Sequence, residues 1–377
     1  MLVAVVKETR EGEARVALVP ELVSRFTDLG YQVKVERGAG AAAQHPDDEY
    51  SAAGAEVSDD VLREADLVLS VQQLTRPQVR RLRPGAATLS FLPPAQSLEA
   101  VAERRDVSIT SFSVELVPRI SRAQSMDALS SQALISGYRC VIVAAGRLRR
   151  FFPLNMTAAG TVPPAQVVVL GAGVAGLQAI ATAKRLGAVV KAYDVRAAAA
   201  EEIRSMGAVA IELELETLEG SGGYAREMTE DRAARQRDLL APHIAAADAL
   251  ITTAAVPGRT APVLVTTAMV EQMKPGSVVV DLAAETGGNV EGSVPGSVVQ
   301  IGGAQVWGAF NVPSQMPGPA SRLYAQNLVS LVTLMTADGV FAPDFDDEIV
   351  SGCCVTHAGQ ILHAPTRETL EGGSNSE

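Results

Sequence analysis

The stretch from Val167 to Arg196 constrains the fold more than any other part of this chain. It reads VVVLGAGVAGLQAIATAKRLGAVVKAYDVR: an apolar run, a glycine turn, an apolar helical segment and a second apolar run that ends at Asp194. Within the turn, Gly171, Gly173 and Gly176 form the pattern G-x-G-x-x-G. Strand, glycine turn, helix, strand and acidic residue, in this order within one βαβ unit, are typical of a dinucleotide-binding fold.

Each glycine of the turn has its own steric role. Gly171 permits the tight turn, Gly173 leaves room for a pyrophosphate against the backbone, and Gly176 lets the helix pack closely on its strand. The helix expected to begin near Val174 presents unpaired N–H groups and the positive end of its dipole to that phosphate. The alternative is a glycine turn in an α/β unit that binds no nucleotide. The full order of elements favours the nucleotide site.

Asp194 sets the expected choice of nucleotide. It lies eighteen residues after Gly176, where a carboxylate accepts hydrogen bonds from the adenosine ribose and repels a 2′-phosphate. A charge-assisted bond of about 1.5–3 kcal/mol favours NAD(H) by about tenfold to a hundredfold before repulsion is counted. Arg196, two residues further on, works against this preference. The sequence therefore predicts NAD(H).

Length, charge and cysteine content narrow the class of protein. A chain of 377 residues exceeds one core of ordinary size, so two domains are expected. A net charge of −11 argues against nucleic acid or an anionic membrane surface as partner. Cys140, Cys353 and Cys354 have no metal-site spacing, so we expect reduced thiols, no metal and a cytoplasmic protein. No stretch approaches the roughly 18–20 apolar residues of a spanning helix, so no direct membrane insertion is expected.

The pattern of apolar runs predicts an α/β protein with two Rossmann-like, doubly wound parallel-sheet domains and a cleft between them. Residues 1–128 with 310–377 form the first domain, which a C-terminal helix and hairpin complete; residues 129–309 form the NAD(H)-binding domain. Predicted strands of the first domain are 2–6, 32–36, 67–71, 87–92 and 107–114, and those of the second include 189–194, 208–213, 249–253 and 277–282.

Two helices and the tail complete this outline. Residues 127–147 are predicted to form a helix that is interrupted near Gly137. A second helix, residues 321–336, follows a proline-rich hinge at Pro313, Pro317 and Pro319 and is expected to return to the first domain. The tail after Thr369 is expected to be disordered.

Several segments carry a resemblance to one family. KETREGEARVALVP, residues 7–20, resembles the opening shared by alanine dehydrogenases and the NAD(H)-binding component of proton-translocating nicotinamide nucleotide transhydrogenase. RISRAQSMDALSSQ, residues 119–132, is similar to the transhydrogenase specifically. The likeness continues through MTAAGTVPPAQ and the glycine turn, GGYAREM, ITTAAVPGR and MKPGSVVVDLAAETGGN, so it spans almost the whole chain.

The resemblance implies an enzyme that is active only with partner components. The chain would bind NAD(H) and exchange hydride with NADP(H) bound by a separate component, while a membrane component couples the exchange to proton translocation. The family also implies a homodimer that is held at the inner membrane through its partners. Hydride transfer between two nicotinamides moves no proton, so it needs positioned rings rather than a general acid or base.

The family also implies which residues serve the reaction. Gln124, Arg119 and Asp127 would be the catalytic polar loop around the nicotinamide. The expected cofactor-binding residues are Ser130, Gly171, Gly173, Val174, Gly176, Asp194, Val195, Arg196, Gly223, Tyr224, Thr253, Ala254 and Ala255. A surface loop with a helix cap, with Ser125 as the capping residue and Asp127 complementing the first turn, is the alternative interpretation of the polar loop.

Two further segments of the expected cofactor site have simpler alternatives. Gly223 and Tyr224 lie in a glycine-rich acidic stretch that the family uses as a lid over bound nucleotide; a passive solvated loop is the alternative. Thr253, Ala254 and Ala255 end a predicted strand, where small side chains let a dinucleotide lie close to the backbone. Core packing explains the alanines equally well.

Two other functions remain as alternatives. An alanine dehydrogenase needs groups that bind pyruvate and handle protons, and Arg15 stands where that family anchors the substrate carboxylate. Where that family has a lysine and a histidine, this chain has Gln72–Gln73 and Pro93–Pro94, and Glu285 replaces a late aspartate. The histidines are expected on the surface or in ordinary packing. A non-enzymatic NAD(H)-sensing module is the third possibility.

Overall fold

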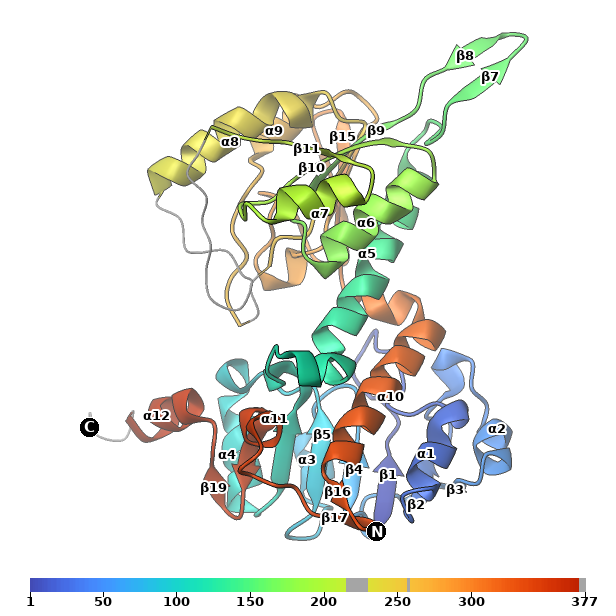
Figure 1. The fold of residues 1–377 in the computed structure, drawn as a ribbon, viewed down its shortest axis with the longest axis vertical. Helices are drawn as coiled ribbons and strands as arrows, with labels where there is room; N and C mark the ends of the chain where they lie inside the picture. Colours follow the sequence, from blue (N-terminus) through green and yellow to red (C-terminus); the bar gives the residue numbers. More distant parts are fainter. Residues whose placement is uncertain (215–229, 256–257, 373–377) are drawn as a thin grey trace. The chain divides into compact units, whose positions relative to one another are not determined.

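The computed structural model describes residues 1–214, 230–255 and 258–372. The chain divides into two compact units, unit 1 (residues 1–132 and 313–377) and unit 2 (residues 133–312), drawn in Figure 1. The predicted domain boundaries, after residues 128 and 309, lie a few residues before these divisions.

Unit 1 is built on an eight-stranded sheet with the order β19-β18-β6-β5-β4-β1-β2-β3. Its strands are β1 (Leu2–Val5), β2 (Gln32–Glu36), β3 (Glu56–Ser58), β4 (Leu67–Leu69), β5 (Ala87–Ser90), β6 (Thr110–Ser113), β18 (Cys354–His357) and β19 (Gln360–Ile361). The first six pair in parallel, whereas β18 pairs antiparallel with β6 and with β19. The predicted parallel strands are therefore present, and the C-terminal segment adds an antiparallel edge.

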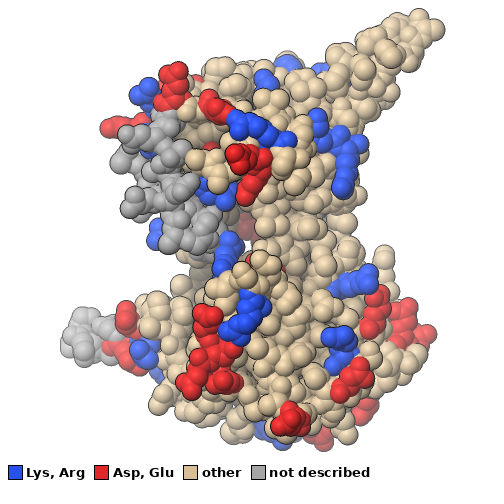
Figure 2. All heavy atoms as spheres, viewed as in Figure 1, with Lys and Arg blue, Asp and Glu red and all other residues tan. Residues whose placement is uncertain are grey.

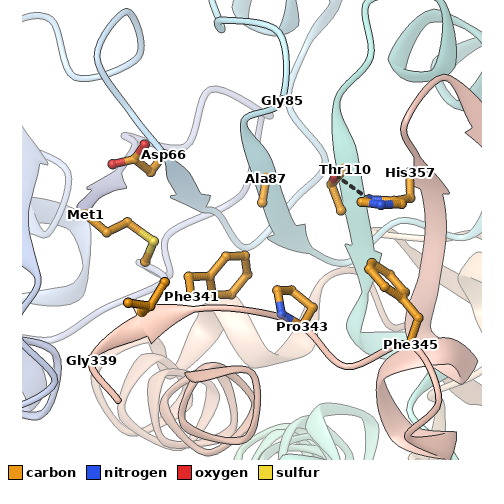
Figure 3. Close-up of a pocket in the computed structure, with 11 residues that line it drawn as sticks. Met1, Asp66, Gly85, Ala87, Thr110, Gly339, Phe341, Pro343, Phe345 and His357 are labelled. Carbon is orange, nitrogen blue, oxygen red and sulfur yellow. Dashed lines mark hydrogen bonds between the residues drawn. The ribbon is translucent and has the colours of Figure 1, made fainter. Parts of the chain in front are cut away.

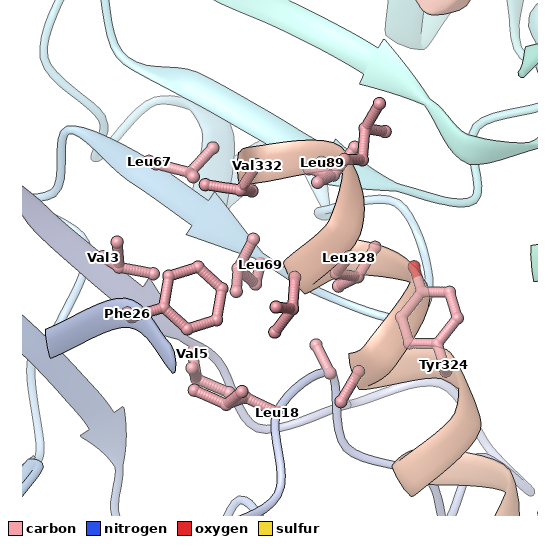
Figure 4. Close-up of a cluster of buried hydrophobic side chains, with 14 of the residues drawn as sticks. Val3, Val5, Leu18, Phe26, Leu67, Leu69, Leu89, Tyr324, Leu328 and Val332 are labelled. Atoms are coloured by element: carbon pink, nitrogen blue, oxygen red, sulfur yellow. The ribbon is translucent and has the colours of Figure 1, made fainter. Parts of the chain in front are cut away.

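The core of unit 1 joins the two ends of the chain. Its helices are α1 (Val23–Thr27), α2 (Asp47–Ala52), α3 (Arg76–Val79), α4 (Leu98–Asp106), α10 (Pro317–Leu334), α11 (Glu348–Cys353) and α12 (Ala364–Gly372). Figure 4 shows Leu328 and Val332 of α10 packed with Leu69 and Leu89 of the sheet and Phe26 of α1. The C-terminal helix is thus part of the N-terminal core.

Two expectations for the C-terminal region are wrong. Pro317 and Pro319 stand inside the first turn of α10 rather than in a hinge before it, because proline is tolerated where helical N–H groups have no partner. The tail is helical through Gly372 in α12, and only residues 373–377 fall outside the described part of the chain.

Unit 2 holds a seven-stranded sheet with the order β11-β10-β9-β12-β13-β15-β14. Its strands are β9 (Gln166–Leu170), β10 (Val189–Tyr193), β11 (Val209–Ala210), β12 (Ala249–Thr252), β13 (Val278–Asp281), β14 (Val298–Ile301) and β15 (Ala304–Gly308). Only β14 runs antiparallel among them. The strand order reverses between β9 and β12, which is the switch point where such sheets bind ligands at their carboxyl ends.

Five helices accompany this sheet. They are α5 (Ala128–Arg147), which begins in unit 1, α6 (Val174–Arg185), α7 (Ala199–Ser205), α8 (Glu230–Ala245) and α9 (Thr267–Glu271). Sequence patterns did not predict β14 and β15, nor the hairpin of β7 (Asn155–Thr157) and β8 (Gly160–Val162), which projects from unit 2 in Figure 1.

Helix α5 runs without the interruption predicted near Gly137. A Cβ atom at this position would collide with the backbone carbonyl of Ala175 in α6. Gly137 therefore serves close packing between two helices, not helix termination. Because α6 carries the glycine turn at its start, this contact helps to fix the turn.

Helix α5 is also long and apolar enough, by length and composition, to cross a membrane, the single such helix in the described part of the chain. The sequence expectation of no such stretch is therefore wrong as stated. Cys140, Val141 and Ala144 of this helix are nevertheless buried in the core of unit 2, and core helices pass the same test.

Acidic and basic side chains are interspersed on the face drawn in Figure 2, and acidic groups gather over α2. The first turn of α2 contains Asp47, Asp48 and Glu49, which complement the positive end of its dipole. Many of the surface charges form ion pairs, such as Arg122 with Asp347 and Glu348. Exposed pairs of this kind contribute about 0–1 kcal/mol each.

Candidate functional site: the carboxyl edge of the unit 2 sheet

The glycine turn connects β9 to α6 at the switch point of the unit 2 sheet. Gly171 has a φ of 97°, a left-handed conformation that favours glycine, and its N–H donates to Tyr193 O at 2.8 Å. A Cβ at Gly176 would collide with the carbonyl oxygen of Gly171. These two glycines are therefore required by the fold itself.

Gly173 is different, because the protein does not require glycine there. It is exposed, its φ of −73° suits any residue, and no heavy atom lies within 4 Å of the position of an added Cβ. Open space over a glycine at the start of a helix fits a ligand that must approach the backbone closely. A dinucleotide pyrophosphate is such a ligand.

The start of α6 can hold an anion. Gly173 is the N-cap residue and has no side chain to bond the first N–H groups of this 12-residue helix. Val174, which opens the helix, is 42% exposed. The N-terminus thus presents amide donors and a positive dipole end without a capping side chain.

The carboxylate of Asp194, directly after β10, faces this turn. It accepts the Ala172 N–H at 2.7 Å, inside the G-x-G sequence, and the Arg196 N–H at 2.9 Å. The Arg196 guanidinium binds the same carboxylate through Nε at 2.9 Å and Nη2 at 3.2 Å. Arg196 Nη2 also donates to Ala172 O at 3.1 Å. Asp194 therefore compensates the charge of Arg196. Val195 between them is half-buried beside the core.

The residues after β12 complete this edge. Thr253 Oγ1 donates to the carbonyls of Leu170 at 3.3 Å and Gly171 at 3.2 Å. The Ala254 N–H donates to Asn289 Oδ1 at 2.9 Å, and Ala255 is exposed. The structure thus brings together three predicted groups: the glycine turn, Asp194 with Arg196, and Thr253 with Ala254.

The predicted polar loop lies in unit 1. Arg119 and Gln124 are exposed, and Gln124 belongs to a 3₁₀ helix, Ser121–Met126. Asp127 precedes α5, where its carboxylate accepts the Ser130 N–H at 2.8 Å and the Ser130 hydroxyl at 2.6 Å. Asp127 rather than Ser125 is therefore the capping side chain. Gly223 and Tyr224 lie outside the described residues.

A buried cluster in unit 1 engages Arg15, the candidate carboxylate anchor. Its guanidinium donates to Glu13 Oε1 at 2.8 Å and Oε2 at 2.7 Å, and to Gln132 Oε1 at 2.9 Å. Glu13 also accepts from Gln72 Nε2 at 2.7 Å and from the Ser314 hydroxyl. Burial alone would raise the pKa of Glu13, but Arg15 outweighs it and holds that pKa at about 2. The sequence interpretation missed Glu13, which occupies the guanidinium internally.

Unit 1 also has a cavity of about 480 Å³. In Figure 3, Asp66, Ala87 and Thr110 lie at the amino ends of β4, β5 and β6, and Phe341 and Phe345 face them. Nucleotides bind α/β sheets at the carboxyl ends of strands, so this cavity does not match the expected site.

Comparisons with known proteins agree with this geometry. Residues 4–136 match the family model "Alanine dehydrogenase/PNT, N-terminal domain", and residues 140–364 match "Alanine dehydrogenase/PNT, C-terminal domain". The chain is 46% identical to the first polypeptide of the NAD(P) transhydrogenase alpha subunit of Rhodospirillum rubrum, over 96% of this chain and 98% of that protein. It is 29% identical to alanine dehydrogenase of Mycolicibacterium smegmatis over 98% and 97%.

A solved structure, the transhydrogenase from Sinorhizobium meliloti, superposes with a TM-score of 0.86 at 44% identity, covering 97% of this chain and 100% of that one. The fold and the site define a dinucleotide-binding α/β protein. The chain belongs to the alanine dehydrogenase/PNT family. The resemblance to the transhydrogenase alpha component seen in residues 119–132 is confirmed by near full-length identity.

Proposed function

We propose that this chain is the NAD(H)-binding subunit of a proton-translocating transhydrogenase. It holds NAD(H) at the glycine turn of unit 2 and exchanges hydride directly with NADP(H) on a partner component, and a membrane component couples the exchange to proton translocation. The observation that carries this proposal is the open space over Gly173 beside Asp194, in a chain 46% identical to a transhydrogenase subunit. The chain is held at the membrane through these partners.

The preference for NAD(H) follows from Asp194 and Arg196. The carboxylate is aimed into the turn by the Ala172 N–H, where it accepts ribose hydroxyls and repels a 2′-phosphate. Arg196, the nearby cation that would favour such a phosphate, is bound by that carboxylate through two nitrogens. Its charge is therefore compensated before a nucleotide arrives.

The proposed chemistry asks little of the protein except position. A bound NADH supplies a hydride from its nicotinamide ring to the nicotinamide of the partner's NADP⁺, which leaves NAD⁺ and NADPH and releases no proton in the step. Gln124, Arg119 and Asp127 would hold the nicotinamide and its ribose by hydrogen bonds, with Ser130 beside them. The bond between Asp127 and Ser130 fixes both side chains and supports this assignment.

An alanine dehydrogenase activity is disfavoured by the cluster around Arg15. A substrate carboxylate would have to displace Glu13, whose two oxygens already take both sides of the guanidinium fork. Gln72, at the position of the missing lysine, is bonded to Arg10 and Glu13 instead. His45, His357 and His363 bond Glu49, Thr110 and Thr366 respectively, in ordinary packing.

Reconstitution tests the proposed function. With the NADP(H)-binding component, the chain is expected to catalyse reduction of an NAD⁺ analogue by NADPH, followed by absorbance. The isolated chain, given NADH, pyruvate and ammonium, is expected to show no turnover. Alanine formation would establish the dehydrogenase, and NADH binding without exchange in the complex would establish a sensing module.

Gln124→Asn separates positioning from binding. The shorter amide no longer reaches the same point, so hydride transfer is expected to fall about tenfold or more because ring alignment is lost. The NADH dissociation constant should stay nearly unchanged, because the adenosine and pyrophosphate contacts lie elsewhere. Single-turnover rates with the partner component measure the effect, and an unchanged rate contradicts a positioning role for Gln124.

We also propose a homodimer, which the β7–β8 hairpin supports. Two-stranded hairpins are marginally stable alone, yet this one carries exposed apolar side chains: Met156 is 75% exposed, and Leu154 and Phe151 before it are 52% and 57% exposed. A second copy of the chain covers such a surface. Sedimentation at the mass of one chain would contradict the dimer.

A further inference from the structure

We propose that Asn289 is a positioning residue for the nucleotide: it fixes the backbone of Thr253 and Ala254 against the glycine turn and thereby sets the affinity for NAD(H). The inference rests on the proposed NAD(H) binding and adds a residue that touches no nucleotide itself. Asn289 lies in the segment after β13 and is fully buried.

The side chain of Asn289 uses its carboxamide as a strand uses a peptide group. Its Oδ1 accepts the Ala254 N–H at 2.9 Å, and its Nδ2 donates to Ala254 O at 2.8 Å. The second Nδ2 hydrogen goes to Pro262 O at 2.8 Å. One side chain therefore satisfies both backbone groups of Ala254 and ties that residue to Pro262, eight positions further along the chain.

The backbone of Asn289 is itself held from below. Its N–H donates to both oxygens of Asp281, at 3.2 and 3.1 Å, at the end of β13. The same fully buried carboxylate accepts the Val290 N–H at 3.2 Å and the Thr252 hydroxyl at 3.0 Å. The carbonyl of Asn289 accepts the N–H groups of Leu264 and Val265. The carboxamide is therefore presented to Ala254 from a fixed base.

Ala254 passes this constraint to the nucleotide turn. Thr253, its neighbour, donates to the carbonyl of Gly171, and a Cβ at Gly171 would lie 3.1 Å from the Ala254 nitrogen. The two segments are thus in van der Waals contact across the ends of β9 and β12. A shift of Ala254 by a fraction of an ångström must move the turn or open a gap beside it.

An alternative role is structural only. Asn289 would then hold β13 and the segment after β12 together, so its loss would lower stability and leave nucleotide affinity unchanged. A matched control is Thr356→Val, which removes a buried hydroxyl bonded to Ile109 O at 2.8 Å in unit 1, far along the chain from the turn. It is expected to lower stability without changing NADH affinity.

Asn289→Ala and Asn289→Asp in the full-length chain test the proposal, with NADH titrated by calorimetry and unfolding followed by circular dichroism. Removing the carboxamide leaves two backbone groups unpaired, so NADH is expected to bind about tenfold more weakly. In the reconstituted enzyme the KM for NADH should rise by a similar factor while kcat changes little, because the nicotinamide contacts lie elsewhere.

The aspartate variant guards against a chain that fails to fold. It keeps the acceptor for the Ala254 N–H but turns a second oxygen toward two carbonyls, and a proton on that oxygen restores one donor. NADH affinity of this variant is expected to recover in part between pH 8 and pH 6, unlike that of the wild type.

Wild-type affinity in both variants, or equal loss in Thr356→Val, overturns the proposal. Failure of the wild-type chain to bind NADH overturns the proposed function instead, so the two outcomes are distinct.

Discussion

Gly173→Ala is expected to fold as the wild type does and to bind NADH about tenfold to a hundredfold more weakly. The new methyl group meets no protein atom within 4 Å, and the backbone conformation suits alanine. It occupies the space that a pyrophosphate needs to reach the N–H groups of α6, so the ligand loses about 1.5–3 kcal/mol of charge-assisted hydrogen bonding. Calorimetric titration with NADH and a thermal unfolding scan measure the two quantities separately.

Two other glycines act as controls. Gly146 lies near the end of α5 and also has no atom within 4 Å of an added Cβ, so Gly146→Ala should retain NADH affinity and gain up to about 1 kcal/mol of stability from helix propensity. Gly176→Ala should lower stability itself, because its Cβ collides with Gly171 O. Unchanged NADH affinity in Gly173→Ala would contradict the assignment of the pyrophosphate to this turn.

Local pattern predicted the elements that local pattern determines. The strand at residues 32–36 agrees with β2, and the apolar runs of the βαβ unit agree with β9 and β10, because alternating or continuous apolar side chains specify strands directly. The glycine turn and Asp194 could be placed together because one βαβ unit contains them. The α/β class followed from the same alternation of elements.

Contacts between distant segments could not be predicted in this way. Gly137 has the sequence signature of a helix break, yet its reason is a neighbour in α6. Asn289 bonds Ala254 across 35 residues, and Ser314 bonds Glu13 across 301. No periodicity encodes such pairs, because their partners are chosen by the tertiary packing. The candidate site was therefore predicted where it touches the nucleotide and missed where it is supported from behind.

Asp194→Asn is expected to reverse much of the nucleotide preference. The substitution keeps the shape and an acceptor oxygen near the turn, but it removes the charge that repels a 2′-phosphate and that holds Arg196 at 2.9 and 3.2 Å. NADH should lose about tenfold in affinity, because its ribose gives up a charge-assisted bond. NADPH should gain a similar factor, because the released guanidinium is a planar donor suited to phosphate. Parallel titrations with NADH and NADPH report the ratio.

The source of the gain can be isolated with Arg196→Ala. In the wild-type background this change should alter NADPH affinity little, because Asp194 already compensates the arginine. In the Asp194→Asn background it should remove most of the NADPH gain while NADH affinity stays where it was. A double-mutant cycle over the four proteins gives the coupling between the two residues. If the NADPH gain survives without Arg196, loss of repulsion alone sets the preference and the ion pair has no part in it.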